Sequence, residues 1–273
     1  MIAMPILATE PDVVTRMALG ALRFIDPITG HSVTEGLSVL ARIGNKKFPA
    51  TPSNRGVHLF HQLPGMSDTS FRGEPTDVPL EYEFNIEVRD TLRRYFSTSF
   101  KTKFDPRLKA LPVCPELATL GKKIPLYTTP WRMPRNDWAT IRGTLWFFTA
   151  DKPAAWALLR VYRAVDNKFL VEGVADKDGI FMLMFLWPKP EPQVIGVPYD
   201  LHWKINIEAF YDAPATQIPD GENILPALCS ILQQKKVTLL ANIVSNVELN
   251  TQKMISEQTL LLKTDEQNVL YLK

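Results

Sequence analysis

The chain has few of the residues on which enzymes and metal proteins most often rely. It contains two cysteines and four histidines among 273 residues, and its formal net charge is only +2. A charge this small excludes nucleic-acid binding driven by electrostatics alone. No apolar run approaches the roughly 18 residues that a membrane-spanning helix needs. The first residues also lack the basic start and the apolar core of a signal peptide, so the sequence predicts a cytoplasmic protein.

The two cysteines, Cys114 and Cys229, allow two interpretations. They can form a disulfide, but secreted domains of this size usually contain more cysteine. The favoured interpretation is therefore two separate buried thiols in a reducing compartment.

Motifs that carry chemistry are scarce. The sequence shows no glycine-rich phosphate loop, no dinucleotide fingerprint and no serine nucleophile elbow. His58 and His61 lie three residues apart on an expected strand, where they face opposite sides and cannot jointly bind a metal ion without a bend. Asp176–Gly179 (DKDG) resembles part of a calcium loop but lacks its downstream glutamate, which favours a tight turn. We expect no catalytic residue, no cofactor and no metal site, and we expect that the protein is not an enzyme.

Proline, by contrast, is abundant, with 22 residues against 13 glycines. Hydrophobic residues make up 45% and charged residues 22% of the chain, which is typical of a folded protein. Between Ile141 and Phe185, four apolar runs are each closed by Asp, Asn, Gly or Pro, a pattern typical of an antiparallel β-sandwich. The runs are Leu145–Phe148, Trp156–Tyr162, Phe169–Val174 and Ile180–Phe185.

The first half of the chain shows the same kind of pattern. The clearest expected strand is Glu81–Arg89, in which Tyr82, Phe84, Ile86 and Val88 alternate with polar residues and predict one buried and one wet face. Further expected strands are Leu19–Ile25, Leu37–Ile43, Gly56–Leu63, Leu92–Phe104 and, in the second half, Leu201–Tyr211. The two halves show a similar order of strands and turns. This order favours an internal duplication over the alternative that any two small sandwiches have similar turn residues between their strands.

We therefore predict an all-β protein with two tandem antiparallel β-sandwich domains. The expected parts are an N-terminal arm (1–15), a first sandwich (16–104), a proline-rich connector (105–137), a second sandwich (138–213) and a C-terminal segment (214–273).

The C-terminal segment shows no obvious core of its own. Its pattern predicts a short helix or turn at Ile224–Gln234, a strand at Val237–Val247, and a closing hairpin formed by Thr259–Lys263 and Val269–Leu272. Such a segment must pack on the second domain or on a neighbouring subunit, as strands do in β-augmentation. The apolar residues expected to make these contacts are Leu225, Leu228, Ile231, Leu260, Leu262, Leu270 and Tyr271.

Two other groups of residues are candidates for ligand contacts. The tryptophans, six in all, can stack on sugar rings, although sandwich cores use such residues more often. Basic residues interleave with aromatic residues in Arg89–Lys109, a pattern that a solvated strand face explains better than an acidic partner or a membrane surface.

Several stretches carry a resemblance to a known family. The sequences GTLWFFTADKPAAWALLRVYRA and GVADKDGIFMLMFLWPKPEP resemble proteins with carboxypeptidase-regulatory-like (transthyretin-like) β-sandwich units, encoded in gene clusters of phage-tail-like contractile injection systems. The stretches that fit the same family are ALRFIDPITGHSVTEGLSVLA, GVHLFHQLPG, EYEFNIEVRDTLRRYF, IPLYTTPWRMP, LPALCSILQQ and TLLLKTDEQNVLYL. The resemblance covers most of the chain and rests on turn and core patterns.

The resemblance implies transthyretin- or Ig-like sandwiches and a non-enzymatic accessory component of a baseplate. It implies contacts with other baseplate proteins in several symmetric copies, with no nucleic acid, no small-molecule substrate and no direct membrane contact. The particle would lie in the cytoplasm, and the residues leave open whether it is free or docked on a membrane. The alternative is a carbohydrate-binding β-sandwich module that uses exposed aromatic residues of the second domain.

Overall fold

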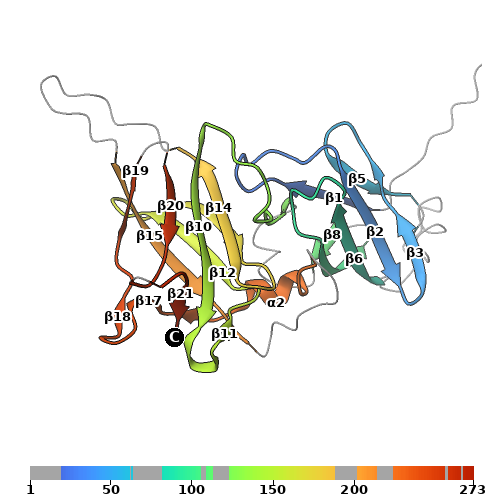
Figure 1. The fold of residues 1–273 in the computed structure, drawn as a ribbon. Coiled ribbons are helices and arrows are strands. Elements are labelled where there is room, and N and C mark those ends of the chain that lie inside the picture. The colour runs from blue at the N-terminus through green and yellow to red at the C-terminus, as the bar shows by residue number, and fades with distance from the viewer. Residues whose placement is uncertain are drawn as a thin grey trace, which may run out of the picture.

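A computed structural model describes residues 20–61, 63, 82–105, 109–112, 123–187, 202–213, 224–255, 258–265 and 267–273. These residues form two β-sandwiches that lie side by side (Figure 1). The expected all-β fold with tandem sandwiches is confirmed. The expected N-terminal arm, 1–15, lies outside the described residues.

The first sandwich packs a four-stranded sheet, in the order β4-β5-β1-β9, against a five-stranded sheet, in the order β3-β2-β6-β7-β8. Its strands are β1 (Gly20–Ile25), β2 (Leu37–Ile43), β3 (Lys46–Pro49), β4 (Thr51–Pro52), β5 (Val57–Phe60), β6 (Tyr82–Asp90), β7 (Thr98–Asp105), β8 (Lys109–Pro112) and β9 (Lys123–Pro125).

Strand β6 shows why the sequence folds in this way. Phe84, Ile86 and Val88 are buried in the core between the two sheets, whereas the alternate Glu83 and Arg89 are exposed. A period of two is what a strand with one buried face requires. The expected alternation of this strand is confirmed at these positions.

The region expected as a connector contributes strands to the first sandwich. Strand β8 pairs with β7, and β9 pairs in parallel with β1. Both strands are short and contain proline, so they show no hydrophobic period that the sequence could reveal.

The second sandwich also has two sheets. In one, β10 pairs with β14 and β11 along one edge and with β20 and β21 along the other, and β21 continues to β17 and β18. In the other, β13-β12-β15 is followed by β16 and β19. The strands are β10 (Trp138–Phe147), β11 (Lys152–Pro153), β12 (Leu158–Arg163), β13 (Lys168–Val174), β14 (Ile180–Leu186), β15 (His202–Phe210), β16 (Lys236–Val237), β17 (Leu239–Asn242), β18 (Val247–Glu248), β19 (Gln252–Ile255), β20 (Thr259–Leu262) and β21 (Leu270–Leu272), and the helices are the 3-10 turn η1 (Phe148–Ala150) and α2 (Leu228–Leu232). The four apolar runs between Ile141 and Phe185 correspond to β10, β12, β13 and β14.

The closing hairpin expected at the C-terminus is wrong. Strands β20 and β21 do not pair with each other but follow one another in parallel along the same edge of β10. Between them the chain makes an excursion, anchored by the buried Thr264, whose N–H donates to the carbonyl oxygen of Val269 (3.0 Å) and whose hydroxyl donates to that of Leu240 (2.5 Å). The turn-forming residues predict correctly that the chain turns between β20 and β21. They do not predict that β21 pairs with β10 rather than with β20.

The two sandwiches share a hydrophobic core. Trp156, from the second sandwich, is fully buried in the core of the first, where its ring meets that of Phe96 edge to face with 5.7 Å between centroids. Helix α2 lies between the sandwiches (Figure 1) and adds Leu228 and Ile231 to the same core. Just before α2, the N–H of Leu225 donates to the carbonyl oxygen of Ser97 in the first sandwich (2.9 Å).

Gln234 holds the backbone of Trp156 in an unfavourable conformation. Trp156 has a φ of 63°, in the left-handed region that bulky residues rarely adopt. The buried Gln234 amide donates from Nε2 to the carbonyl oxygen of Trp156 (2.9 Å), and its Oε1 accepts from the N–H of Leu158 (3.1 Å). One side chain thus satisfies two buried backbone groups at and just before the start of β12.

Two polar networks also cross the junction. The Tyr127 hydroxyl, beside the first sandwich, donates to Glu172 on β13 (2.5 Å), and Glu172 in turn pairs with Arg160 on β12 (2.6 Å). Burial raises the pKa of the Tyr127 hydroxyl well above its usual value, so the group remains a donor.

In the second network, Arg132 pairs with Asp26 of the first sandwich (2.7 Å). Its guanidinium lies 5.0 Å from the ring centroid of Tyr95 and 4.8 Å from that of Trp138 on β10. Burial alone would raise the pKa of Asp26, but hydrogen bonds from Arg132 and from the N–H of Ile28 lower it below its usual value. The ion pair is therefore charged at neutral pH and joins the two sandwiches.

Replacing Gln234 with alanine tests this junction. We expect Gln234→Ala to lower the free energy of unfolding by roughly 2–4 kcal/mol, because it leaves a buried acceptor and a buried donor unpaired. The measurement is urea unfolding followed by tryptophan fluorescence. The exposed neighbour Lys235 provides the control, and Lys235→Ala should change stability by less than about 0.5 kcal/mol. Equal effects of the two substitutions would contradict the role given to Gln234.

Candidate functional site

The residues expected to contact partners are used mainly inside the chain. Leu225, Leu228 and Ile231 belong to the core of the first sandwich, and Leu262 and Leu270 to that of the second. Leu260 and Tyr271 are partly buried on β20 and β21. The sequence left open whether these seven side chains pack on the second domain or on a neighbouring subunit. Five of them are buried within this chain, three of these in the core of the first sandwich. The apolar spacing indicated burial but not what the residues are buried against.

The C-terminal segment likewise completes this chain rather than standing apart from it. Its strands β16 to β21 enter both sheets of the second sandwich, and α2 enters the core of the first.

His58 and the DKDG turn lie in structural positions. His58 is 2% exposed beside the ring of Phe24, and burial lowers its pKa. The Asp176 carboxylate accepts from the N–H groups of Asp178 (2.9 Å) and Ile180 (2.8 Å), and Gly179 follows with a φ of 76°, so the tight turn is confirmed. Among the described residues, no group of three or more His, Cys, Asp or Glu is placed to hold a metal ion.

The expectation of two free thiols is wrong for Cys229, which is disulfide-bonded. The one other cysteine of the sequence, Cys114, lies outside the described residues. Composition misled here, because a low cysteine count argues against a disulfide-rich domain but not against a single bond.

The tryptophans of the second sandwich are engaged within the structure. Trp138 and Trp156 are buried, and the rings of Trp187 and Trp203 pack on each other with 5.0 Å between centroids. The indole N–H of Trp146 donates to Asp151 (3.0 Å). The alternative that these tryptophans bind carbohydrate therefore gains no support.

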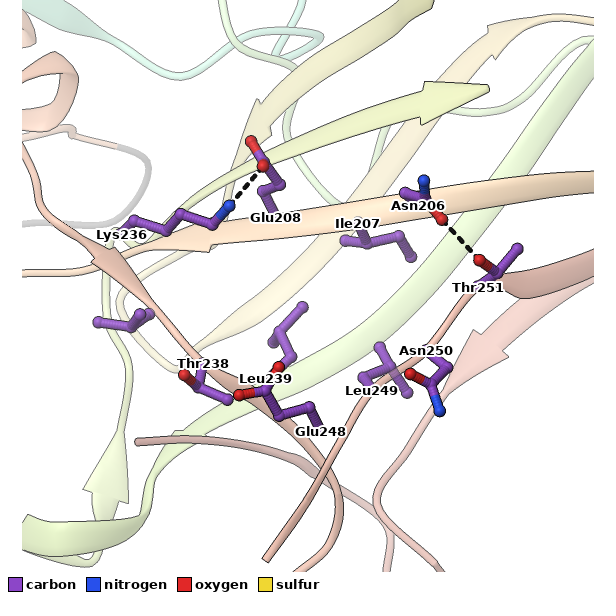
Figure 2. A pocket seen from close by; sticks show the side chains of 11 residues that line it. Asn206, Ile207, Glu208, Lys236, Thr238, Leu239, Glu248, Leu249, Asn250 and Thr251 are labelled. Atoms are coloured by element: carbon purple, nitrogen blue, oxygen red, sulfur yellow. Dashed lines mark hydrogen bonds and ion pairs between the residues drawn. The ribbon is translucent and has the colours of Figure 1, made fainter. Parts of the chain in front are cut away.

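A polar pocket of about 330 Å³ lies beside β15, on the edge opposite to β12 (Figure 2). Strand β19 pairs with His202–Ile205, and β16 pairs with Ala209 and Phe210. Between these two partners, within the described part of the chain, Asn206–Glu208 has no strand alongside on this edge.

Backbone direction places the polar groups of Ile207 at this gap. On one side of β15, the N–H of Tyr211 donates to the carbonyl oxygen of Lys235 (2.8 Å), and on the other side, the carbonyl oxygen of Lys204 accepts from Ala164 (2.9 Å). Since N–H and C=O groups alternate in direction along a strand, those of Ile207 point with those of Tyr211, toward the gap.

The walls of the pocket are formed where the chain crosses between the sheets. After β16 the chain leaves through Thr238 for β17 in the opposite sheet, and it returns through Leu249, whose N–H donates to the carbonyl oxygen of Leu239 (2.7 Å). Lys236 pairs with Glu208 (2.5 Å), as Figure 2 shows. No signal in the sequence of β15 reveals this gap, because the neighbouring strands create it by leaving.

A second hollow, of about 460 Å³, lies between the loop before β10 and the start of β20. Its main cation, Arg135, is already engaged, since its guanidinium lies 5.7 Å from the ring centroid of Trp138 and pairs with Asp137 (3.5 Å).

Comparisons with known proteins reveal no family. No protein-family model matches the chain, and no curated protein matches it. The Bacillus anthracis TIE protein is 11% identical over 88% of this chain, with a TM-score of 0.26, and this chain spans only 42% of that protein. A streptococcal ancillary pilin is 6% identical, with 92% of this chain and 68% of that chain covered and a TM-score of 0.24. The shaft pilin SpaA of Lactobacillus rhamnosus GG is 9% identical, with 92% and 95% covered and a TM-score of 0.22. Similarities this low carry no argument about function.

In the described part of the chain, no helix has both the length and the apolarity needed to cross a membrane.

The disulfide of Cys229 can be tested by reduction. We expect dithiothreitol to lower the free energy of unfolding of the wild-type chain by about 2–5 kcal/mol, because the bond restricts the unfolded state. The measurement is urea unfolding with and without the reductant. Cys229→Ser is the control, and its stability should not respond to dithiothreitol. A wild-type chain that is equally stable with and without dithiothreitol would rule out a stabilising bond.

Proposed function

We propose that the chain is a non-enzymatic structural component of a multi-subunit assembly, namely an accessory baseplate protein of a contractile, phage-tail-like injection particle. The assembly is taken from the resemblance of the turn and core patterns to that family. The mechanical role is supported by the structure of the junction between the sandwiches.

The observation that carries the mechanical role is the insertion of Trp156 into the core of the first sandwich. Domains within one chain usually move relative to each other unless their interface is large and apolar. Here the interface is a continuous core to which α2 also contributes, and the Arg132–Asp26 and Tyr127–Glu172 contacts span it. A body joined in this way transmits a displacement from one end to the other, as a spacer between moving subunits must.

Three exposed apolar side chains on two joined loops offer this body a contact surface for neighbouring subunits. Leu92 is 54% exposed, Trp131 57% and Met133 83%. Their two loops are joined at the base, because Thr129 donates from its N–H to the carbonyl oxygen of Arg94 (3.0 Å) and from its hydroxyl to that of Arg93 (2.9 Å). Extended apolar patches mark protein interaction sites, and we assign these three residues to such a surface. We call these three residues the apolar loop cluster.

The proposal includes the cytoplasmic location that the resemblance implies. The Cys229 disulfide stands against this part, because such bonds are rare in the cytosol and persist in oxidising compartments. Mass spectrometry of the chain, alkylated at the moment of cell lysis, decides between the two compartments.

Incorporation into particles tests the proposed function. We expect the double substitution Leu92→Glu/Met133→Glu to reduce the amount of the chain in purified particles at least tenfold, because it places charges in the contact surface. The measurement is quantitative mass spectrometry of particles from cells that express each variant. Val244→Glu, at a position 97% exposed in the second sandwich, is the matched control and should incorporate normally.

Two results would overturn the proposal. If the wild-type chain does not co-purify with sheath and tube proteins, the assembly is wrong. If the double variant is incorporated like the wild type, the apolar loop cluster is not the contact.

A further inference from the structure

We propose that the gap beside Ile207 is a binding site for a single aminoacyl unit, that is, a free α-amino acid or the terminal residue of a peptide. We call this gap, lined by Asn206–Glu208, Lys236, Thr238 and Asn250, the ladder notch. The inference is independent of the proposed assembly.

The chemistry follows from the backbone groups that the notch presents. In the hydrogen-bonded pairs of an antiparallel ladder, two opposed residues exchange both of their N–H···O=C bonds. Ile207 offers one donor and one acceptor at this spacing and has no strand opposite in the described part of the chain. The complementary group has a hydrogen-bond donor on one side of a single carbon atom and an acceptor on the other. The backbone of an amino acid is such a group.

The length of the ligand is limited by the two strands that flank the notch. Strand β16 occupies the edge of β15 from Ala209 onward, and β19 occupies it up to Ile205. An added peptide strand would collide with both, so the notch admits one residue rather than an extended segment. This excludes ordinary β-augmentation at this edge.

The polar walls suit a ligand that carries charges of both signs. Lys236 and Glu208 form an ion pair beside the notch (2.5 Å), and Glu248 and Asn250 also line it. Thr251 donates to the Oδ1 of Asn206 (2.8 Å), which fixes that amide at the edge of the pocket (Figure 2). A ligand ammonium group can replace a backbone donor to the carbonyl oxygen of Ile207, and a carboxylate can accept from its N–H. A volume of about 330 Å³ lies within the range of small-molecule pockets.

The experiment follows the backbone amide of Ile207 directly. The full chain, labelled with ¹⁵N-isoleucine, is titrated up to 10 mM with three probes: an equimolar mixture of the twenty L-amino acids, N-acetyl-L-alanine amide, and tri-L-alanine. We expect a saturable shift of the Ile207 amide resonance. A response to the free amino acids alone identifies a free amino acid as ligand, and a response to tri-L-alanine identifies a peptide terminus. No saturable shift with any probe would overturn the proposal.

Two variants separate binding at the notch from binding elsewhere. Lys236→Met should weaken the response at least fivefold. Lys204→Met, on the same strand as Ile207 but outside the pocket, should leave it unchanged. Ile207→Pro removes the N–H that faces the notch without removing a bond to β12, and it should abolish binding as measured by calorimetry. If the proline variant does not fold, Lys236→Met carries the test alone, and an unchanged response of that variant would contradict the proposed site.

Discussion

The burial of Trp156 in the neighbouring sandwich is the constraint on which the rest of the structure depends. Its indole ring lies in the core of the first sandwich while its backbone belongs to the second. The residue accepts a left-handed backbone conformation to reach this position, and Gln234 supplies the hydrogen bonds that such a conformation lacks. Strain of this kind persists only where the surroundings hold it in place, and here the surroundings are both sandwiches at once.

The C-terminal segment follows from the same constraint. Helix α2 contributes to the core that buries this tryptophan, and the strands after it return to the second sandwich and pair with both of its sheets. The chain cannot fill both edges without crossing between the sheets. The crossings at Thr238 and at Leu249 leave one edge of β15 without a strand at Asn206–Glu208 in the described part of the chain, which is how the ladder notch arises. The junction between the sandwiches and the ladder notch therefore both result from the path of the C-terminal segment.

Local pattern revealed much of the fold but little of how its parts meet. Strand β2 agrees with its expected bounds, Leu37–Ile43, and β6 shows the expected alternation, because a period of two depends only on which face is buried. The order of β20 and β21 along β10 depends on a partner over a hundred residues away, and no local residue encodes it.

The candidate sites were predicted less well for a related reason. Leu228 and Ile231 were correctly recognised as apolar residues in need of a partner, but that partner is the core of the first sandwich. The ladder notch consists of backbone groups that every sequence possesses, so only the pairing of strands can reveal it. The disulfide of Cys229 is equally a matter of spatial proximity rather than of composition.

The cooperativity of unfolding tests the shared core most directly. Hydrogen exchange measured by mass spectrometry at increasing urea concentration reports the opening of β6, in the first sandwich, and of β12, in the second, within one sample. Because both sandwiches depend on the core around Trp156, we expect the most protected amides of β6 and β12 to lose protection at the same urea concentration. Loss of protection in one sandwich while the other stays protected would contradict it.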